Sequence, residues 1–319
     1  MSDTNSSEAP LLRDDSETFD ALRDGAAERF AIDSGAVEKE YWALEVLRAA
    51  TAPLDGVDEF VFKGGTSLSK AYGIIERFSE DIDLLVITTA TGKALKRVLR
   101  AVADRTSTDL GIEHERAHEG RGFLNARYTY PARREVGFLS PGVLLEIGSR
   151  GGPFPNQRRS VQSLMADAAV IINPEAATRY VDLAAFEVTV LAPERTLAEK
   201  LAFLHHRAST NDLTALAAGA RHLYDVAMLL SNADVRNALQ NPDVIRELMI
   251  DIDARSDAAG WPYTPRPEAG FASSPAFTDA PRITNALNSG YARLDDLVWG
   301  HRLSFAEAID IVRTHHGLI

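Results

Sequence analysis

The spacing of apolar and polar residues divides the chain into two parts with different periodicities. Between residues 16 and 191, stretches with helical periodicity alternate with short apolar runs typical of strands, whereas residues 192–319 are mainly helical in pattern. Residues 1–15 are rich in Ser, Asp and Glu, which predicts a disordered N-terminus. We therefore expect an α+β fold, with a mixed sheet and flanking helices followed by a mainly helical C-terminal domain.

The same patterns predict the individual elements. In the first part we expect helices at residues 16–32, 36–52 and 91–106, and strands at 59–62, 81–87, 123–130, 142–148 and 186–191. Residues 149–160 are rich in Gly, Pro and Arg, which predicts a loop. In the second part we expect helices at 193–207, 213–230, 242–252 and 304–315, and an irregular loop at 256–280.

Composition narrows the class of protein. Of the 319 residues, 45% are hydrophobic and 25% are charged, as is typical of a soluble globular protein. The chain has no cysteine, which excludes disulfides and a cysteine nucleophile and fits a cytoplasmic location. We see no apolar signal segment in residues 1–20 and no run of the ~20 apolar residues that a membrane helix requires, so we expect no membrane partner.

The segment between residues 59 and 87 carries the clearest chemical signal. A predicted strand leads into the turn Gly64-Gly65-Thr66-Ser67, which opens a short helix and offers backbone N–H groups and the Ser67 hydroxyl to a triphosphate. The next strand begins Asp81-Ile82-Asp83. Residues two apart on a strand face the same side, so Asp81 and Asp83 direct two carboxylates toward one point. Nucleotide chemistry needs such an anion site beside a divalent cation site.

A third carboxylate is expected from a neighbouring strand, because two-metal sites for phosphoryl transfer use several carboxylates. Glu146 is the best candidate, since it is the only acid within the apolar run 143–147. A buried carboxylate is costly unless it is paired or bound to metal, so an ion pair with Arg127 or Arg150 is the alternative. Mg²⁺ suits the site because it prefers oxygen ligands, and Mn²⁺ is a second choice.

Residues 64–68 (GGTSL) and 77–84 (RFSEDIDL), joined by a short helix, resemble the AbiEii family of nucleotidyltransferase toxins, which includes the mycobacterial MenT toxins. Two later segments extend the resemblance. Residues 196–201 (TLAEKL) are similar to the helical lysine motif of the family, and residues 221–225 (RHLYD) are similar to its Arg-x-x-Tyr-Asp motif. The resemblance therefore covers residues 63–225 with its motifs in the family's order.

The resemblance implies a fold of the DNA polymerase β-like nucleotidyltransferase superfamily for residues 16–191, with residues 192–319 completing the active site. Asp81 would be the main metal-binding catalytic carboxylate and Asp83 its partner. Lys200 would contact the nucleotide phosphates, and Asp225 would be a further acidic residue of the site.

The resemblance also implies a reaction and its partners. Such toxins are NTP-dependent nucleotidyltransferases that require Mg²⁺, here as two ions, and the segment Gly64–Ser67 would bind the triphosphate. The expected acceptor is RNA, with the 3′ acceptor end of tRNA as the target, so that translation is blocked. A separately encoded antitoxin is expected as the protein partner.

Other interpretations of these residues stay open at this point. Lys200 could extend its aliphatic stem along an apolar helix face without contacting a phosphate. Asp225 could pair with Arg221 one turn earlier. A protein or a small molecule could be the acceptor instead of RNA. The chain could also be a non-catalytic nucleotide-binding member of the fold, although the intact acidic motif argues against this.

The distribution of charge bears on the choice of acceptor. The net charge of −12 argues against a nucleic-acid partner, but residues 93–159 contain thirteen Lys and Arg against seven Asp and Glu. This basic stretch favours RNA over a protein or small-molecule acceptor. Ordinary solvated surface is the alternative interpretation.

Ser79 is a candidate for regulation because it precedes Asp81 by two residues, which would place it on the site face of the strand. A phosphoryl group adds about −1.5 to −2 charges and three acceptor oxygens. Phosphorylation of Ser79 would therefore compete for the metal ions and repel the triphosphate. The alternative is a serine that only helps to form the turn.

Overall fold

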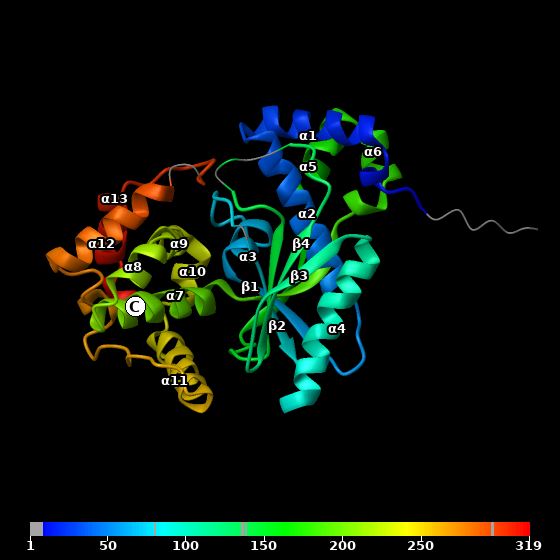
Figure 1. The fold of residues 1–319 in the computed structure, drawn as a ribbon. Coiled ribbons are helices and arrows are strands. Elements are labelled where there is room, and N and C mark those ends of the chain that lie inside the picture. Colours follow the sequence, from blue (N-terminus) through cyan, green and yellow to red (C-terminus); the bar gives the residue numbers. More distant parts are fainter. Residues whose placement is uncertain (1–8, 80, 135–136, 138, 295–296) are drawn as a thin grey trace, which may run out of the picture.

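A computed structural model of the chain describes residues 9–79, 81–134, 137, 139–294 and 297–319. Within these residues, the N-terminal part is built on a seven-stranded mixed sheet with the order β3-β4-β5-β2-β1-β7-β6 (Figure 1). The strands are β1 (Glu59–Lys63), β2 (Asp81–Ile87), β3 (Glu113–Gly120), β4 (Phe123–Thr129), β5 (Val143–Gly148), β6 (Asn156–Val161) and β7 (Phe186–Leu191). The central strand β2 runs antiparallel to β1 and parallel to β5.

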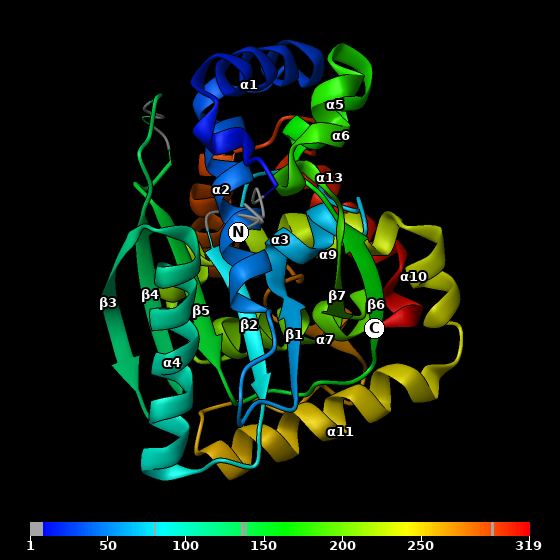
Figure 2. The same ribbon diagram turned by 90° about the vertical axis from the view of Figure 1, so that its right-hand side faces the viewer.

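Helices of the N-terminal part cover one face of this sheet. In Figure 2, α2 and α4 lie in front of the strands, and α1, α5 and α6 lie above them. The amphipathic pattern of α4 explains its position, because Leu99, Val102, Ala103 and Thr106 are buried at helical spacing. The bounds are α1 (Ser16–Phe30), α2 (Ser34–Ala50), α3 (Gly64–Lys70), α4 (Gly92–Leu110), α5 (Leu164–Ile172) and α6 (Pro174–Arg179).

The C-terminal part is helical and lies on the other side of the sheet (Figures 1 and 2). Its helices α7, α11 and α12 each open on a proline, a residue preorganised for the first helical turn. The bounds are α7 (Pro193–Ser209), α8 (Leu213–Ala218), α9 (Arg221–Ser231), α10 (Ala233–Ala238), α11 (Pro242–Ala259), α12 (Pro281–Tyr291) and α13 (Phe305–Thr314).

Each part has its own hydrophobic cluster, and a short segment joins them. The first cluster extends from Leu12 to Val190, and the second is formed mainly by residues 197–319. Ile74 and Ile75 belong to the second cluster although they lie in the first part of the chain. The backbone N–H of Phe78 donates to Leu297 O at 2.9 Å. The segment between α3 and β2 is therefore fixed by the C-terminal helices, next to the acidic motif.

The mixed sheet with flanking helices confirms the α+β fold class, but several predicted boundaries were wrong. Residues 156–161 form β6 instead of part of a loop, and the helix expected at 213–230 is divided into α8 and α9 at Gly219. Four helices and one strand were not predicted: α5, α6, α10, α12 and β3. β3 and β6 are edge strands with mostly exposed side chains, so they lack the alternation by which a strand is recognised.

The predicted disorder of residues 1–15 is wrong for the part that the structure describes. Leu12 is buried in the first hydrophobic cluster, and its N–H donates to Asp182 Oδ1 at 2.8 Å. Residues 1–8 lie outside the described residues. Among the helices that are described, none has the length and apolar character needed to cross a membrane.

Candidate active site

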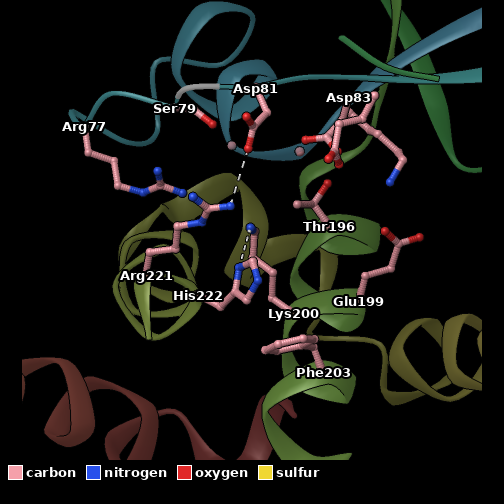
Figure 3. Close-up of a pocket in the computed structure, with 14 residues that line it drawn as sticks. Arg77, Ser79, Asp81, Asp83, Thr196, Glu199, Lys200, Phe203, Arg221 and His222 are labelled. Carbon is pink, nitrogen blue, oxygen red and sulfur yellow. Dashed lines mark hydrogen bonds and ion pairs between the residues drawn. The ribbon is translucent and has the colours of Figure 1, made fainter. Parts of the chain in front are cut away.

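The three predicted carboxylates lie on one face of the two central parallel strands. β2 and β5 pair with Asp83 opposite Glu146, and Asp81 precedes Asp83 by two residues on the same face. All three side chains line a cavity of about 340 Å³ (Figure 3). The strand argument made from the sequence therefore placed these residues together correctly.

Glu146 is held by a neutral partner and not by an arginine. Asn125 Nδ2 on β4 donates to Glu146 Oε1 at 2.8 Å. Arg127 instead donates to the Pro141 carbonyl, and Arg150 lies over the Trp261 ring. Burial, and then the charges of Asp83 and Asp81, raise the pKa of Glu146 to about 7. The carboxylates thus repel one another, and a cation would relieve this repulsion.

Two glycines allow the backbone to approach the acidic strand closely. Gly64 has a φ of +79°, and a Cβ at this position would collide with Asp83 Oδ2. A Cβ at Gly65 would lie 2.9 Å from Arg77 Nη2 and 3.0 Å from Ser79 Oγ. Both glycines line the cavity, in agreement with the phosphate-binding turn expected from the sequence.

The neighbouring hydroxyl groups do not face the cavity. Thr66 Oγ1 donates to Asp81 O at 2.7 Å, and Ser67 Oγ donates to Gly64 O at 2.9 Å. Ser67 is fully buried, and neither residue is among those that line the cavity. The expectation that the Ser67 hydroxyl holds the triphosphate is therefore wrong, because this group stabilises the turn itself.

A buried ion-pair cluster lies on the helical side of the cavity. Arg77 Nε and Nη2 donate to the two oxygens of Asp225, both at 2.7 Å, and Lys200 Nζ lies 2.8 Å from Asp225 Oδ2. Burial alone would raise the pKa of Asp225, but the charges of Arg77 and Lys200 hold this pKa well below its usual range. Asp225 therefore pairs with Arg77 and Lys200, and not with Arg221, which was the alternative interpretation from the sequence.

Asp225 itself does not reach the cavity. Its side chain is fully buried, and it is not among the lining residues, whereas Lys200 and Arg77 are. The structure therefore places Asp225, which was expected as a further acidic residue of the site, behind the cavity wall, where it bonds to Lys200 and Arg77.

Lys200 is also bound to a histidine that the sequence analysis missed. Lys200 Nζ lies 3.2 Å from His222 Nδ1, a contact drawn in Figure 3. A lysine ammonium only donates, so Nδ1 accepts and the imidazole proton lies on Nε2. Burial, and then the Lys200 charge, lower the pKa of His222 well below its usual value, which keeps the ring neutral.

Arg221 and Ser79 lie at the acidic end of the cavity. Arg221 Nη2 reaches from α9 to within 3.6 Å of Asp81 Oδ2 (Figure 3). Ser79 precedes β2 and is not part of the strand, but it lines the cavity beside Gly65. The remaining lining residues were not among the predicted site residues and come from β1 and α7: Lys63, Thr196, Glu199 and Phe203. Glu199 and Arg221 lie within the recognised motifs, which could have marked them.

The donor set suits a hard divalent cation, although the side chains are not arranged around one. Among the described residues, no group of three or more His, Cys, Asp or Glu side chains is placed to hold a metal ion. Asp81 points toward Arg221 (Figure 3). Asp81, Asp83 and Glu146 offer only carboxylate oxygens, which Mg²⁺ and Mn²⁺ accept, and their mutual repulsion fits a site completed by cations.

Comparison with known proteins agrees with this geometry. A model of the family "Nucleotidyl transferase AbiEii toxin, Type IV TA system" matches residues 46–294. The chain belongs to the AbiEii nucleotidyltransferase toxin family. This match includes every candidate residue of the cavity and confirms the family expected from the motifs, so the protein is a nucleotidyltransferase toxin of a toxin–antitoxin system.

One of the solved structures that match the chain supports the fold. MenT4, a nucleotidyltransferase toxin from Mycobacterium tuberculosis, is 18% identical, with 93% of this chain and 88% of that chain covered and a TM-score of 0.59. JHP933 from Helicobacter pylori is 16% identical, with coverages of 86% and 94% and a TM-score of 0.34. No curated protein matches the chain. At these identities the likeness to MenT4 is a likeness of fold.

Proposed function

We propose that this toxin transfers a nucleotide from an NTP to the 3′ acceptor end of tRNA in the cytoplasm and so blocks translation. The observation that carries the proposal is the meeting of three carboxylates and a buried lysine in one cavity: Asp81, Asp83, Glu146 and Lys200. Carboxylates on neighbouring strands are the usual ligands of a two-metal nucleotidyl-transfer site. A non-catalytic member of the fold would not need this arrangement.

Asp81, Asp83 and Glu146 would hold two Mg²⁺ ions, or Mn²⁺ in their place. When bound, the ions would neutralise the triphosphate and lower the pKa of the attacking hydroxyl. Because Arg221 lies 3.6 Å from Asp81, metal binding would compete with this ion pair. Arg221 would then be released toward the phosphates at the mouth of the cavity, where its charge is favourable.

The remaining parts of the cavity would bind the NTP. The backbone at Gly64 and Gly65 would contact the phosphates, and Lys200 would place its charge on them from the opposite wall. Asp225 would not touch the nucleotide. It would keep Lys200 and Arg77 in place before the substrate arrives, because both cations already bond to it.

Control by the antitoxin could act through Ser79. Its hydroxyl lines the cavity beside Gly65, so a phosphoryl group there would occupy space needed by the triphosphate and attract the metal ions. We therefore propose phosphorylation of Ser79 as a way to silence the toxin. A stoichiometric complex with the antitoxin is the alternative.

A transfer assay tests the proposed function. The protein is incubated with each labelled NTP, Mg²⁺ and total RNA, and the products are separated by gel electrophoresis. We expect label on tRNA, dependent on Asp81 and abolished by EDTA. Label on a protein or a small molecule instead of RNA would contradict the proposed acceptor, and no label in any fraction would contradict transferase activity.

A further inference from the structure

A second hollow lies at the β3 edge of the sheet, outside the active-site cavity. Its volume is about 770 Å³, compared with about 340 Å³ for the cavity. It is lined by three chain segments within residues 88–99, 119–123 and 149–150. These segments are the start of α4, the turn between β3 and β4, and the end of β5, and we call this hollow the edge groove.

The edge groove is strongly basic. Lys93, Lys96, Arg121 and Arg150 line it, and Glu119 is its only lining acid among the described residues. The charge of Glu119 is already compensated, since its carboxylate lies 3.3 Å from Lys96 Nζ and accepts two hydrogen bonds from a neighbouring arginine. Lys93 and Arg121 are exposed and have no ion-pair partner among the described residues.

An aromatic ring lies beside these charges. The guanidinium of Arg150 lies 5.7 Å from the centroid of Trp261, whose surface is 44% exposed. Trp261 follows α11, which runs beneath the lower ends of the strands in Figure 2. Arg255 of α11 donates to Gly151 O at 3.0 Å and so ties this helix to the end of β5. Basic side chains with an exposed aromatic ring are typical of surfaces that bind single-stranded nucleic acid.

One wall of the edge groove belongs to the face of the sheet that carries the carboxylates, whereas its α4 wall lies on the opposite face. Asn125 on β4 donates to Glu146, so its side chain is on the site face. Phe123 precedes Asn125 by two residues on the same strand, so it points to that face as well, and it lines the edge groove. Two residues of strand correspond to about 7 Å. A strand of RNA that passes around the ends of the strands would therefore join the two sites.

We propose that the edge groove binds the phosphate backbone of the single-stranded 3′ segment of the acceptor RNA, with Trp261 as a stacking surface for a base. This inference rests on the proposed RNA acceptor. It requires that the 3′ hydroxyl lie at Asp81 and Asp83 while the preceding phosphates lie along Lys93, Arg121 and Arg150. The groove supplies positive charge where an acidic protein would otherwise repel RNA.

The structure also divides the basic stretch of the sequence. Arg158 and Arg159 lie on β6, at the opposite edge of the sheet from β3. Arg133 packs over the ring of Phe19 at 4.7 Å and is committed to the N-terminal helices. The basic residues between 93 and 159 therefore do not form one surface, and those of the edge groove lie at the opposite end of the sheet order from Arg158 and Arg159.

A pair of charge reversals with a matched control tests the proposal. We compare Lys93→Glu/Arg121→Glu with Arg158→Glu/Arg159→Glu, because all four side chains are exposed and both pairs change the net charge equally. The affinity for a short fluorescent single-stranded RNA with a free 3′ hydroxyl is measured by anisotropy at several salt concentrations. NTP binding in the presence of Mg²⁺ is measured in parallel and should stay unchanged in both variants.

We expect the groove variant to bind RNA at least tenfold more weakly than wild type. The slope of log affinity against log salt should become less steep by about 1.4, which is about 0.7 for each of the two lost phosphate contacts. The β6 variant should keep the wild-type slope. Trp261→Ala should weaken binding without changing the slope, because stacking releases no counterions.

Three results would overturn the proposal. Equal weakening in both double variants would indicate a general charge effect, and an unchanged slope in the groove variant would exclude phosphate contacts there. Loss of polyglutamate binding with intact RNA binding would assign the groove to an acidic protein segment. In these cases the groove proposal fails, but transfer of nucleotides to RNA by the wild-type protein would still support the proposed function. If the wild-type protein neither binds nor extends RNA, the proposed function is contradicted as well.

Discussion

The two walls of the active-site cavity differ in how their charges are balanced. On the strand wall, Asp81, Asp83 and Glu146 are like charges in close proximity, and the pKa of Glu146 is raised. On the helical wall, Asp225 is bonded to two cations and is fully buried. The negative charge of the strand wall is therefore only partly balanced in the free protein, by Arg221 and Lys63, whereas Asp225 on the helical wall is fully paired. Substitutions on the first should change activity alone, and substitutions on the second should change stability too.

The largest effect is expected from Asp81→Ala. Loss of this carboxylate should remove a metal ligand and reduce nucleotide transfer by at least about 10³-fold, together with toxicity in growing cells. The melting temperature should change little, because the substitution relieves repulsion among the carboxylates while it gives up the partly exposed ion pair with Arg221. Transfer is measured with labelled NTP, and unfolding is followed by circular dichroism.

Asp55→Ala is the matched control, since Asp55 is an exposed aspartate away from the cavity. It should keep wild-type transfer and wild-type stability. Near-wild-type transfer by Asp81→Ala at saturating NTP would exclude a metal-ligand role for Asp81. Loss of transfer with a collapsed melting transition would instead mean that Asp81 is structural, and the contrast between the two walls would fail.

The second prediction concerns the helical wall. Asp225→Ala leaves Arg77 and Lys200 buried without a counter-charge, which should cost about 3–5 kcal/mol of unfolding free energy. Asp279→Ala breaks the exposed pair with Arg313 and should cost at most about 1 kcal/mol. Chemical denaturation of both variants measures the difference. Equal, small losses would show that the buried cluster does not stabilise the protein.

The same cluster predicts a pH dependence. The pKa of Asp225 is lower in the folded than in the unfolded chain, so its contribution to stability is complete above the unfolded pKa of about 4 and is lost as pH falls below it. Wild type should therefore lose more stability than Asp225→Ala between about pH 5 and pH 3. Parallel stability curves for the two proteins would contradict this assignment.

How well the sequence predicts this site depends on whether a residue's partner is local. Asp81, Asp83 and Glu146 were placed correctly because strand alternation is a local rule. The partners of Asp225 were not, because Arg77 is 148 positions away in the chain and no periodicity connects them. The hydroxyl of Ser67 was misassigned for the opposite reason, since its bond to Gly64 O is local and removes it from the cavity.

The same distinction applies to the fold. Strands with an apolar run, such as β2 and β5, were recognised, whereas the polar edge strands β3 and β6 were not. This error hid the edge groove, because the turn between β3 and β4 carries Arg121 and lines that groove. The number of basic residues between 93 and 159 could suggest an RNA partner. Only the order of the strands shows that Arg121 and Arg158 lie at opposite edges of the sheet.

The next prediction concerns Lys200, a cavity-lining residue of the helical wall. Lys200→Ala should reduce kcat/KM for NTP by about 10²-fold, because a charge directed at the phosphates acts strongly in a site that excludes water. Mn²⁺ binding, measured by calorimetry, should remain, since the carboxylates are untouched. Asp225 keeps its two bonds to Arg77, so the loss of stability should be smaller than for Asp225→Ala. Wild-type kinetics with reduced stability would assign Lys200 to packing alone.

The smallest effect is expected from Ser79, where the strand wall meets the phosphate turn. Ser79→Asp adds a negative charge beside Gly65 and Asp81 and should reduce transfer by about tenfold, whereas Ser79→Asn, of the same size but neutral, should keep most of it. Ser79→Ala should keep at least part of the activity. If charge is the cause, the Asp variant should also need more Mg²⁺ for half-maximal rate. Full activity of Ser79→Asp, with no phosphate found by mass spectrometry after co-expression with the antitoxin, would leave Ser79 as a turn residue.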